Sequence, residues 1–409
     1  MRLAAVPILV ALALSGCAAT LSHIDVDKSQ VEMDSLAESD NLDADVASLA
    51  KPLVDSDETP GIIVGVLTAD GSMHFYAYGY ADKATLTPLT PDTIVPVGSL
   101  TKGFVGAIMD NLVRQGVFSW DDTLKTLLPG VPMSRDAGKI TLREMATHTA
   151  GFPRQPMTPE LLFSFIHYEF TGENFYRAFD TPYMLKYLDD FDSSPTMEPV
   201  YSNIGYALMG YIIEQRTGRS LEALLQQMLT SPLGMRQTGF ELDALPGHDQ
   251  RAVGYAGDHP LFLRRGTPTP DFHLTHIMQA TGGLYSTARD MLTFAAACLR
   301  DDGSPLSKLL DDTMRVRVPE VRGATGIAWF VDHVDGEVIT YQEGLIGGFS
   351  NYLGLDRTHH TAVVVFRNSF NWDFPVGHRL LIRIAKAAKI DGHLVITGIE
   401  KDTRKKKDN

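Results

Sequence analysis

Short, mostly apolar stretches bounded by polar turn residues lie near both ends of the main body of the chain, and these stretches predict strands. Residues 61–68 (GIIVGVLT) and 73–80 (MHFYAYGY) are rich in β-branched and aromatic residues, and Asp70-Gly71 between them is a favoured hairpin dipeptide. Near the C-terminus, turns rich in Gly, Asp and His separate four more such stretches. They predict successive antiparallel strands at residues 326–332, 337–342, 350–356 and 361–368.

Apolar residues at helical spacing occupy the middle of the chain and follow the last predicted strand. Residues 375–389 place apolar side chains on one face and bases on the other, which predicts a helix that covers a sheet. Between Ser99 and Met314 the same period predicts helices at residues 101–115, 141–147, 203–217, 220–229 and 287–300. Strands from both ends with helices between them predict an α+β fold, in which helices flank one antiparallel sheet and form an inserted helical subdomain.

Composition and charge narrow the class of protein. With 409 residues, 44% of them hydrophobic, the chain can bury a sizeable core. Its formal net charge of −14 argues against a nucleic-acid partner, which requires a basic surface. Eleven acids and two bases lie in residues 18–60, which predicts a solvated tether before a nearly neutral body.

The first residues are typical of an export signal. After Met1-Arg2, residues 3–14 form an apolar run of about twelve residues, well short of the ~20 that a membrane-spanning helix needs. The ending Leu-Ser-Gly-Cys resembles a bacterial lipobox, which implies cleavage before Cys17 and lipidation of its sulfur. Ala18 in place of aspartate implies outer-membrane sorting, with the protein facing the periplasm of the cell envelope. An ordinary signal peptide, with Cys17 an incidental thiol, is the alternative.

We therefore divide the chain into a lipoprotein signal peptide (1–16), an acidic tether (17–60), a folded domain (61–390) and a basic tail (391–409). The tail ends in KDTRKKKDN, which indicates a solvated segment. Cys298 lies among apolar residues at helical spacing and is expected to be a packed core thiol.

The candidate chemistry begins with Ser-x-x-Lys, which occurs at Ser48 and again at Ser99. The sequence holds no His-Glu-x-x-His, P-loop or Gly-x-Ser-x-Gly pattern, which argues against metalloproteases, P-loop nucleotidases and elbow-type hydrolases. Ser48 falls in the acidic tether, whereas Ser99 opens an apolar helical run. Since positions i and i+3 share a helix face, Lys102 can reach Ser99 and accept its proton if burial or positive charge lowers the pKa of the amine. Alternatively, Ser99 is a helix N-cap beside an exposed Lys102.

Tyr201-Ser202-Asn203 precedes another apolar helix and is the second candidate. A phenol near a lysine can relay a proton, and a carboxamide can bind a substrate amide. The alternative is a core tyrosine followed by an N-capping Asn203.

These motifs and several others resemble, in order along the chain, those of one enzyme family. They are residues 94–102 (IVPVGSLTK), 140–151 (ITLREMATHTAG), 201–206 (YSNIGY), 232–235 (PLGM) and 282–287 (GGLYST). Over residues 61–389 the chain is similar to the serine β-lactamase and penicillin-binding-protein family, in its class C branch with D,D-carboxypeptidases, endopeptidases and esterases. The resemblance implies a β-lactamase/transpeptidase-like fold and no cofactor or metal.

The resemblance also implies residue roles. Ser99 is then the acylated nucleophile, and Lys102 and Tyr201 are the proton-transfer pair. Asn203 is expected to contact substrate and Lys102, and Gln155 to contact the acyl side chain. His148, in the Thr-His-Thr segment, is expected to be structural.

The resemblance implies that Gln342, Glu343, Gly344 and Leu345, in the family's third motif, contact substrate. The sequence keeps the motif's glycine at Gly344 and departs from the motif at Gln342 and Glu343. The family has Lys-Thr-Gly or His-x-Gly there, so Gln342 stands where a cation is expected. Losing that cation and gaining Glu343 opposes an anionic substrate and an ionised Tyr201. The small Gly344 is expected to let substrate approach, and the backbone N–H groups of Ser99 and Leu345 to form an oxyanion hole.

The leading functional hypothesis is an exported, lipid-anchored serine hydrolase that cleaves amide or ester bonds through an acyl-enzyme on Ser99. Its expected partners are a small-molecule or peptidoglycan-derived substrate and, through Cys17, the membrane. Among specific activities, the first hypothesis is a peptidoglycan D,D-peptidase that reacts with β-lactams. The alternatives are a carboxylesterase of the same fold and a non-catalytic, penicillin-recognising scaffold lipoprotein.

Overall fold

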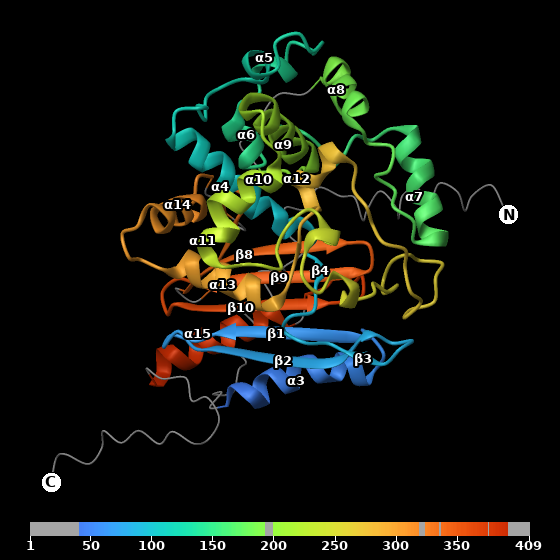
Figure 1. Ribbon diagram of the computed structural model, residues 1–409, viewed down its shortest axis with the longest axis vertical. Coiled ribbons are helices and arrows are strands. Elements are labelled where there is room, and N and C mark those ends of the chain that lie inside the picture. The colour runs from blue at the N-terminus through green and yellow to red at the C-terminus, as the bar shows by residue number, and fades with distance from the viewer. Residues whose placement is uncertain (1–40, 193–198, 319–323, 335–336, 375, 392–409) are drawn as a thin grey trace.

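A computed structural model describes residues 41–192, 199–318, 324–334, 337–374 and 376–391 (Figure 1). The expected signal peptide, Cys17 and the residues after position 391 lie outside this range. In the described part of the chain, no helix has the length and apolar character needed to cross a membrane.

One antiparallel sheet organises the molecule, in the order β3-β2-β1-β10-β9-β8-β7-β6. The predicted first hairpin is confirmed, and its strand β1 also pairs with β10 near the C-terminus, from Ile62 opposite Arg367 to Leu67 opposite Ala362. Distant segments therefore close the sheet, as predicted. The strands are β1 (Gly61–Leu67), β2 (Met73–Asp82), β3 (Thr87–Pro88), β6 (Ala324–Thr325), β7 (Phe330–Val334), β8 (Glu337–Ile346), β9 (Phe349–Asp356) and β10 (Thr361–Arg367), and β4 (Val95–Pro96) pairs with β5 (Tyr285–Ser286) apart from this sheet.

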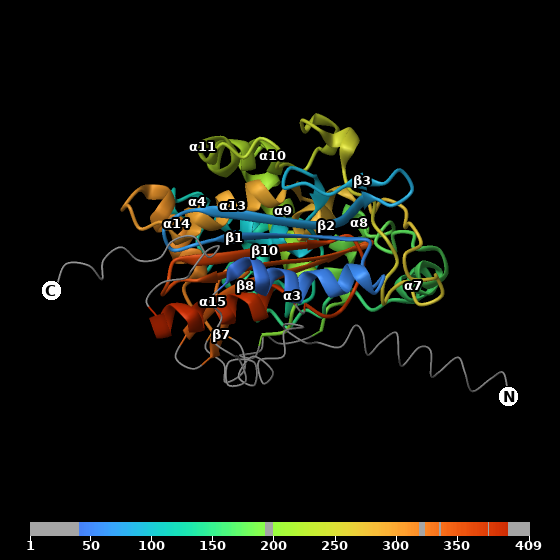
Figure 2. The same ribbon diagram turned by 90° about the horizontal axis from the view of Figure 1, so that it is seen from below.

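Helices cover both faces of the sheet (Figure 2). The C-terminal helix α15 (Gly377–Asp391), predicted at residues 375–389, packs on β9 and β10, and beside it α3 (Leu42–Asp55) packs on β1 and β2. The opposite face packs against α13 (Ala288–Leu299), beyond which the helical region extends. In α13 the thiol of Cys298 is buried, as expected.

Helix α3 corrects the predicted tether, which was expected to run to residue 60. Asn41 caps the helix by accepting a hydrogen bond from the Ala44 N–H at 3.0 Å. Leu42, Val46 and Ala50, spaced four residues apart, are fully buried against the sheet. The acids between them dominated the charge pattern, but Asp43 and Asp45 are half-buried beside this apolar face, and Asp43 accepts a hydrogen bond from the Tyr76 hydroxyl of β2 at 2.6 Å. The folded body therefore includes residues 41–60.

The inserted helical region holds the remaining helices (Figure 1). Four of the predicted helices appear with similar bounds, while the one at residues 220–229 ends at Leu225 and continues as a π-helical turn. Helices α7, α8 and α14 were not predicted. The helices of this region are α4 (Thr101–Arg114), α5 (Leu124–Leu127), α6 (Leu142–Ala146), α7 (Pro159–Thr171), α8 (Thr181–Asp190), α9 (Asn203–Thr217), α10 (Leu221–Leu225), α11 (Ser231–Leu233), α12 (Gln279–Gly282) and α14 (Pro305–Met314).

Candidate active site

A tight turn presents Ser99 between β4 and helix α4. Gly98 in this turn has φ +59°, a conformation that side-chain-bearing residues rarely adopt. A Cβ atom at this position would also lie 3.1 Å from the backbone N, C and O of Leu345, so the turn and strand β8 are in close contact. Thr101 fixes the turn, because its hydroxyl donates to the Gly98 carbonyl at 2.7 Å. Ser99 makes no capping hydrogen bond to the helix, so the N-cap alternative is wrong.

Lys102 lies directly behind Ser99. Its Nζ donates to Ser99 Oγ at 3.1 Å and to the Thr281 carbonyl at 2.5 Å, and the residue is only 2% exposed. The alternative of a solvent-exposed lysine is therefore wrong. Burial, with a smaller contribution from the positive charge of Arg154, holds the pKa of Lys102 well below its ordinary value. The geometry thus places an amine that loses its proton readily beside a hydroxyl group.

Tyr201 is buried on the other side of Ser99. Its ring centroid lies 4.7 Å from that of His148 and 4.6 Å from the guanidinium carbon of Arg154, and Lys102 Nζ is 5.0 Å away. Burial raises the pKa of Tyr201 to about 12, although the charge of Arg154 and a hydrogen bond with Ser99 act in the opposite direction. The phenol is consequently protonated at neutral pH.

His148 holds the Tyr201 segment in place. Its Nδ1 accepts a hydrogen bond from the Ser202 N–H at 3.1 Å, which also fixes the side-chain tautomer. Burial, followed by the charges of Lys102 and Arg154, lowers the pKa of His148 to about 3, so the ring is neutral. These contacts agree with the structural role expected from the sequence.

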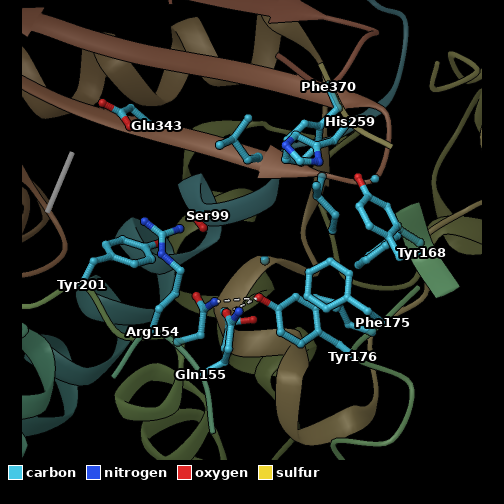
Figure 3. A pocket seen from close by; sticks show the side chains of 18 of the residues that line it. Ser99, Arg154, Gln155, Tyr168, Phe175, Tyr176, Tyr201, His259, Glu343 and Phe370 are labelled. Atoms are coloured by element: carbon cyan, nitrogen blue, oxygen red, sulfur yellow. Dashed lines mark hydrogen bonds between the residues drawn. The ribbon is translucent and has the colours of Figure 1, made fainter. Parts of the chain in front are cut away.

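Asn203 and Gln155 meet through a residue that sequence reasoning did not single out. The Tyr176 hydroxyl accepts a hydrogen bond from Asn203 Nδ2 at 3.1 Å and donates one to Gln155 Oε1 at 2.9 Å (Figure 3). All three line the same pocket as Ser99. The expected contact between Asn203 and Lys102 is not among the hydrogen bonds of the described residues. Ser202, whose hydroxyl accepts from the Gly205 N–H, is the N-cap of α9, so the proposed cap at Asn203 is also wrong.

The four predicted residues of β8 divide between the two faces of the strand. Glu343 and Leu345 line the pocket, whereas Gln342 and Gly344 point towards α4 and the turn before it. Gln342 is 2% exposed, donates to the Ala328 carbonyl at 3.2 Å and packs against Gly103. Since successive side chains of a strand alternate in direction, these four residues cannot all face a substrate. The expectation that Gln342 contacts substrate is therefore wrong.

Gly344 also makes room for a different group from the one expected. A Cβ atom there would lie 2.1 Å from the Val97 carbonyl oxygen, so the missing side chain admits the backbone that precedes Ser99 rather than a substrate. We predict that Gly344→Ala pushes β8 away from this backbone and lowers the free energy of unfolding by about 2–3 kcal/mol, with loss of reactivity at Ser99. Thermal and denaturant unfolding measure the first effect.

A matched glycine provides the control for this substitution. A Cβ atom at Gly138 would meet its nearest neighbours at 3.6 Å, which is ordinary contact. Gly138→Ala is therefore expected to change the free energy of unfolding by less than about 0.5 kcal/mol. Equal stabilities of the two variants would show that β8 tolerates a side chain at Gly344.

Arg154 and an aromatic wall complete the pocket, and neither was predicted. Figure 3 shows the Arg154 guanidinium over the Tyr201 ring beside Ser99, with the aromatic side chains on the far side of the pocket. The density of aromatic residues between positions 163 and 183 was the available signal, because the sequence left residues 152–200 without a role. The wall consists of Phe165, Tyr168, Phe175, Tyr176, His259, Phe272, Phe370 and Trp372.

One group of possible metal ligands lies at the start of β8 and the end of β9, away from this pocket. Ligand atoms of Glu337, Asp356 and His359 lie within 4.8 Å of one another. His359 Nδ1 is 2.6 Å from Asp356 Oδ2, so the histidine and this carboxylate already satisfy each other.

Fold and pocket together define the class of protein. An antiparallel sheet with an inserted helical region holds a serine hydroxyl against a buried lysine amine and a tyrosine, which is the arrangement of a serine hydrolase. The Beta-lactamase family model matches residues 46–387, and the chain belongs to that family.

Individual relatives are distant. A β-lactamase from Psychrobacter immobilis is 27% identical over 297 residues, covering 71% of this chain and 66% of the relative. An unguisins hydrolase from Aspergillus campestris is 26% identical over 351 residues, covering 81% of this chain and 62% of the relative. The chain thus spans less than two thirds of the length of either curated relative.

A solved structure shows the same fold. The crystal structure of a β-lactamase/D-alanine carboxypeptidase from Pseudomonas syringae matches with a TM-score of 0.69 at 22% identity, over 85% of this chain and 99% of that chain. The predicted α+β, β-lactamase/transpeptidase-like fold is therefore confirmed.

Proposed function

We propose that this chain is an exported serine hydrolase that cleaves amide or ester bonds through an acyl-enzyme on Ser99, and that D-alanyl peptides and β-lactams are its substrate class. The contact of the buried Lys102 amine with Ser99 Oγ at 3.1 Å, at the edge of an open pocket, carries this proposal. The family supports hydrolysis, and the crystal structure from Pseudomonas syringae is named a D-alanine carboxypeptidase.

In the proposed mechanism, Lys102 in its neutral form takes the proton of Ser99 as Oγ attacks the carbonyl carbon of the substrate. A carbon–oxygen bond to Ser99 forms, and the bond to the leaving nitrogen or oxygen breaks as the proton is passed to that atom. Tyr201, protonated and hydrogen-bonded with Ser99, relays this proton. Water then hydrolyses the acyl-enzyme by the reverse transfer, which releases the acid and restores Ser99.

The oxyanion of each tetrahedral intermediate needs two donors. The proposal assigns them to the backbone N–H groups of Ser99 and Leu345. The close contact between the Gly98 turn and the Leu345 backbone supports this assignment, because it holds both peptide groups at one end of the pocket.

A carboxylesterase is the second candidate, and the aromatic wall favours it. Eight aromatic side chains that line the pocket together with Ser99 suit a bulky apolar acyl group, which an ester provides without further polar recognition. Strand β8 adds Glu343 rather than a cation to the pocket, which also suits an uncharged substrate.

Export and lipidation at Cys17 remain part of the proposal. The apolar run at residues 3–14 and the following Leu-Ser-Gly-Cys support them. The proposed location is therefore the periplasmic side of the cell envelope, with a lipid anchor in the outer membrane.

Labelling of Ser99 distinguishes the candidates. The purified full chain is incubated with a fluorescent penicillin and, separately, with p-nitrophenyl butyrate, followed by intact and peptide mass spectrometry. A penicillin adduct on Ser99 supports the peptidase-type enzyme, and ester turnover without a lasting adduct supports the esterase. If the protein forms no penicillin adduct and does not turn over the ester, the proposed function is contradicted and the scaffold lipoprotein is favoured.

A further inference from the structure

Strand β8 brings no positive charge to the pocket. Gln342 stands where the family has a cation, but its side chain bonds to Ala328 and packs on α4. The neighbouring pocket residue, Glu343, is an acid. A substrate anion beside Ser99 therefore has no cationic partner on this strand.

Arg154 supplies a positive charge from a different element, the loop between α6 and α7. Its backbone carbonyl accepts a hydrogen bond from the Asn203 N–H at 2.8 Å, which fixes the loop against the start of α9. Its guanidinium carbon lies 4.6 Å from the Tyr201 ring centroid, and the side chain lines the pocket together with Ser99.

The guanidinium of Arg154 is not paired with an anion from the part of the protein that the structure describes. Among the described residues no carboxylate forms an ion pair with it, and its Nε atom is buried without a hydrogen-bond partner. A partly buried guanidinium costs free energy unless an anion pairs with it, and its fork of N–H groups matches a carboxylate well. The positive charge of Arg154 lowers the pKa of Tyr201 more than the negative charge of Glu343 raises it.

We propose that Arg154 is the specificity-determining residue for substrates that carry an anionic group, such as a carboxylate, beside the scissile bond. Its guanidinium binds that group next to Ser99 and so takes the place of a cation on β8. This inference rests on the proposed function, because it requires that the bond attacked by Ser99 lies in the same pocket.

Boronic acids test this inference without turnover, because they bind reversibly to the nucleophilic serine of a serine hydrolase. Binding of phenylboronic acid and of 3-carboxyphenylboronic acid is measured by calorimetry for the wild type, Arg154→Gln, Arg154→Lys and Arg177→Gln. Arg177 is the control, because it is an exposed arginine in the neighbouring segment, paired with Glu173. Thermal unfolding checks that each variant is folded.

We expect the wild type and Arg177→Gln to prefer the carboxylated compound by about 10- to 100-fold, since a charge-assisted pair contributes about 1.5–3 kcal/mol. The ratio of the two affinities is expected to fall to about one in Arg154→Gln and to take an intermediate value in Arg154→Lys. A preference that persists in Arg154→Gln, or equal weakening of both compounds, would overturn the inference. If neither compound binds the wild type, both the proposed function and the role of Arg154 are contradicted. If both compounds bind the wild type equally well, only the role of Arg154 is contradicted.

Discussion

Ser99→Ala is expected to abolish acylation and to reduce turnover of any substrate by about 10⁴-fold or more, because it removes the attacking oxygen. The substitution deletes one atom from a side chain that faces the pocket and makes no capping bond, so the fold is expected to persist. Turnover of p-nitrophenyl butyrate and labelling by fluorescent penicillin measure the loss, and thermal unfolding confirms that the variant is folded.

The second Ser-x-x-Lys of the chain offers a matched control. Ser48 lies on α3, where its hydroxyl donates to the Asp45 carbonyl at 2.8 Å, and it is not among the residues that line the pocket. Ser48→Ala is expected to keep wild-type turnover and labelling. Activity that survives in Ser99→Ala would assign the nucleophile to another residue.

Replacement of Lys102 is expected to have the second largest effect. Lys102→Met keeps most of the buried volume but has no group to accept the Ser99 proton, and it should lower kcat/KM by about 10²–10⁴-fold. Lys102→Arg keeps the positive charge, but a guanidinium does not give up its proton in proteins. Both variants should therefore be similarly inactive if the amine acts as a base. An active arginine variant would show that Lys102 contributes only its charge.

The pH dependence of the wild type tests the same role. Burial and the charge of Arg154 hold the pKa of Lys102 well below its ordinary value, so the amine is neutral over a wider pH range than usual. The neutral amine is the active form, hence kcat/KM is expected to rise with pH through this lowered pKa and to fall on acidification. Tyr201, with a pKa of about 12, stays protonated throughout this range. A profile that falls as pH rises in the same window would contradict the assignment.

Much of the fold could be predicted from local patterns. The hairpin at β1 and β2, the C-terminal strands and helices α4 and α9 each have a composition, apolar pattern and bounding turn residues that are visible within about fifteen residues. Helix α3 was missed because it lies in a strongly acidic stretch and fully buries few apolar residues. Helices α7 and α8 lie in a stretch whose apolar residues are partly exposed, as Phe163 and Phe170 are, so their pattern gave no clear face.

The sequence by itself determined the α+β architecture and the positions of Ser99, Lys102 and Tyr201, since short-range spacing and motif order are properties of neighbouring residues. Tertiary structure decided which β8 side chains reach the pocket, that Tyr176 joins Asn203 to Gln155, and that Arg154 lies over Tyr201. These contacts join segments that are far apart along the chain. Their geometry depends on how the sheet, the helical region and the loops pack together, which no local pattern specifies.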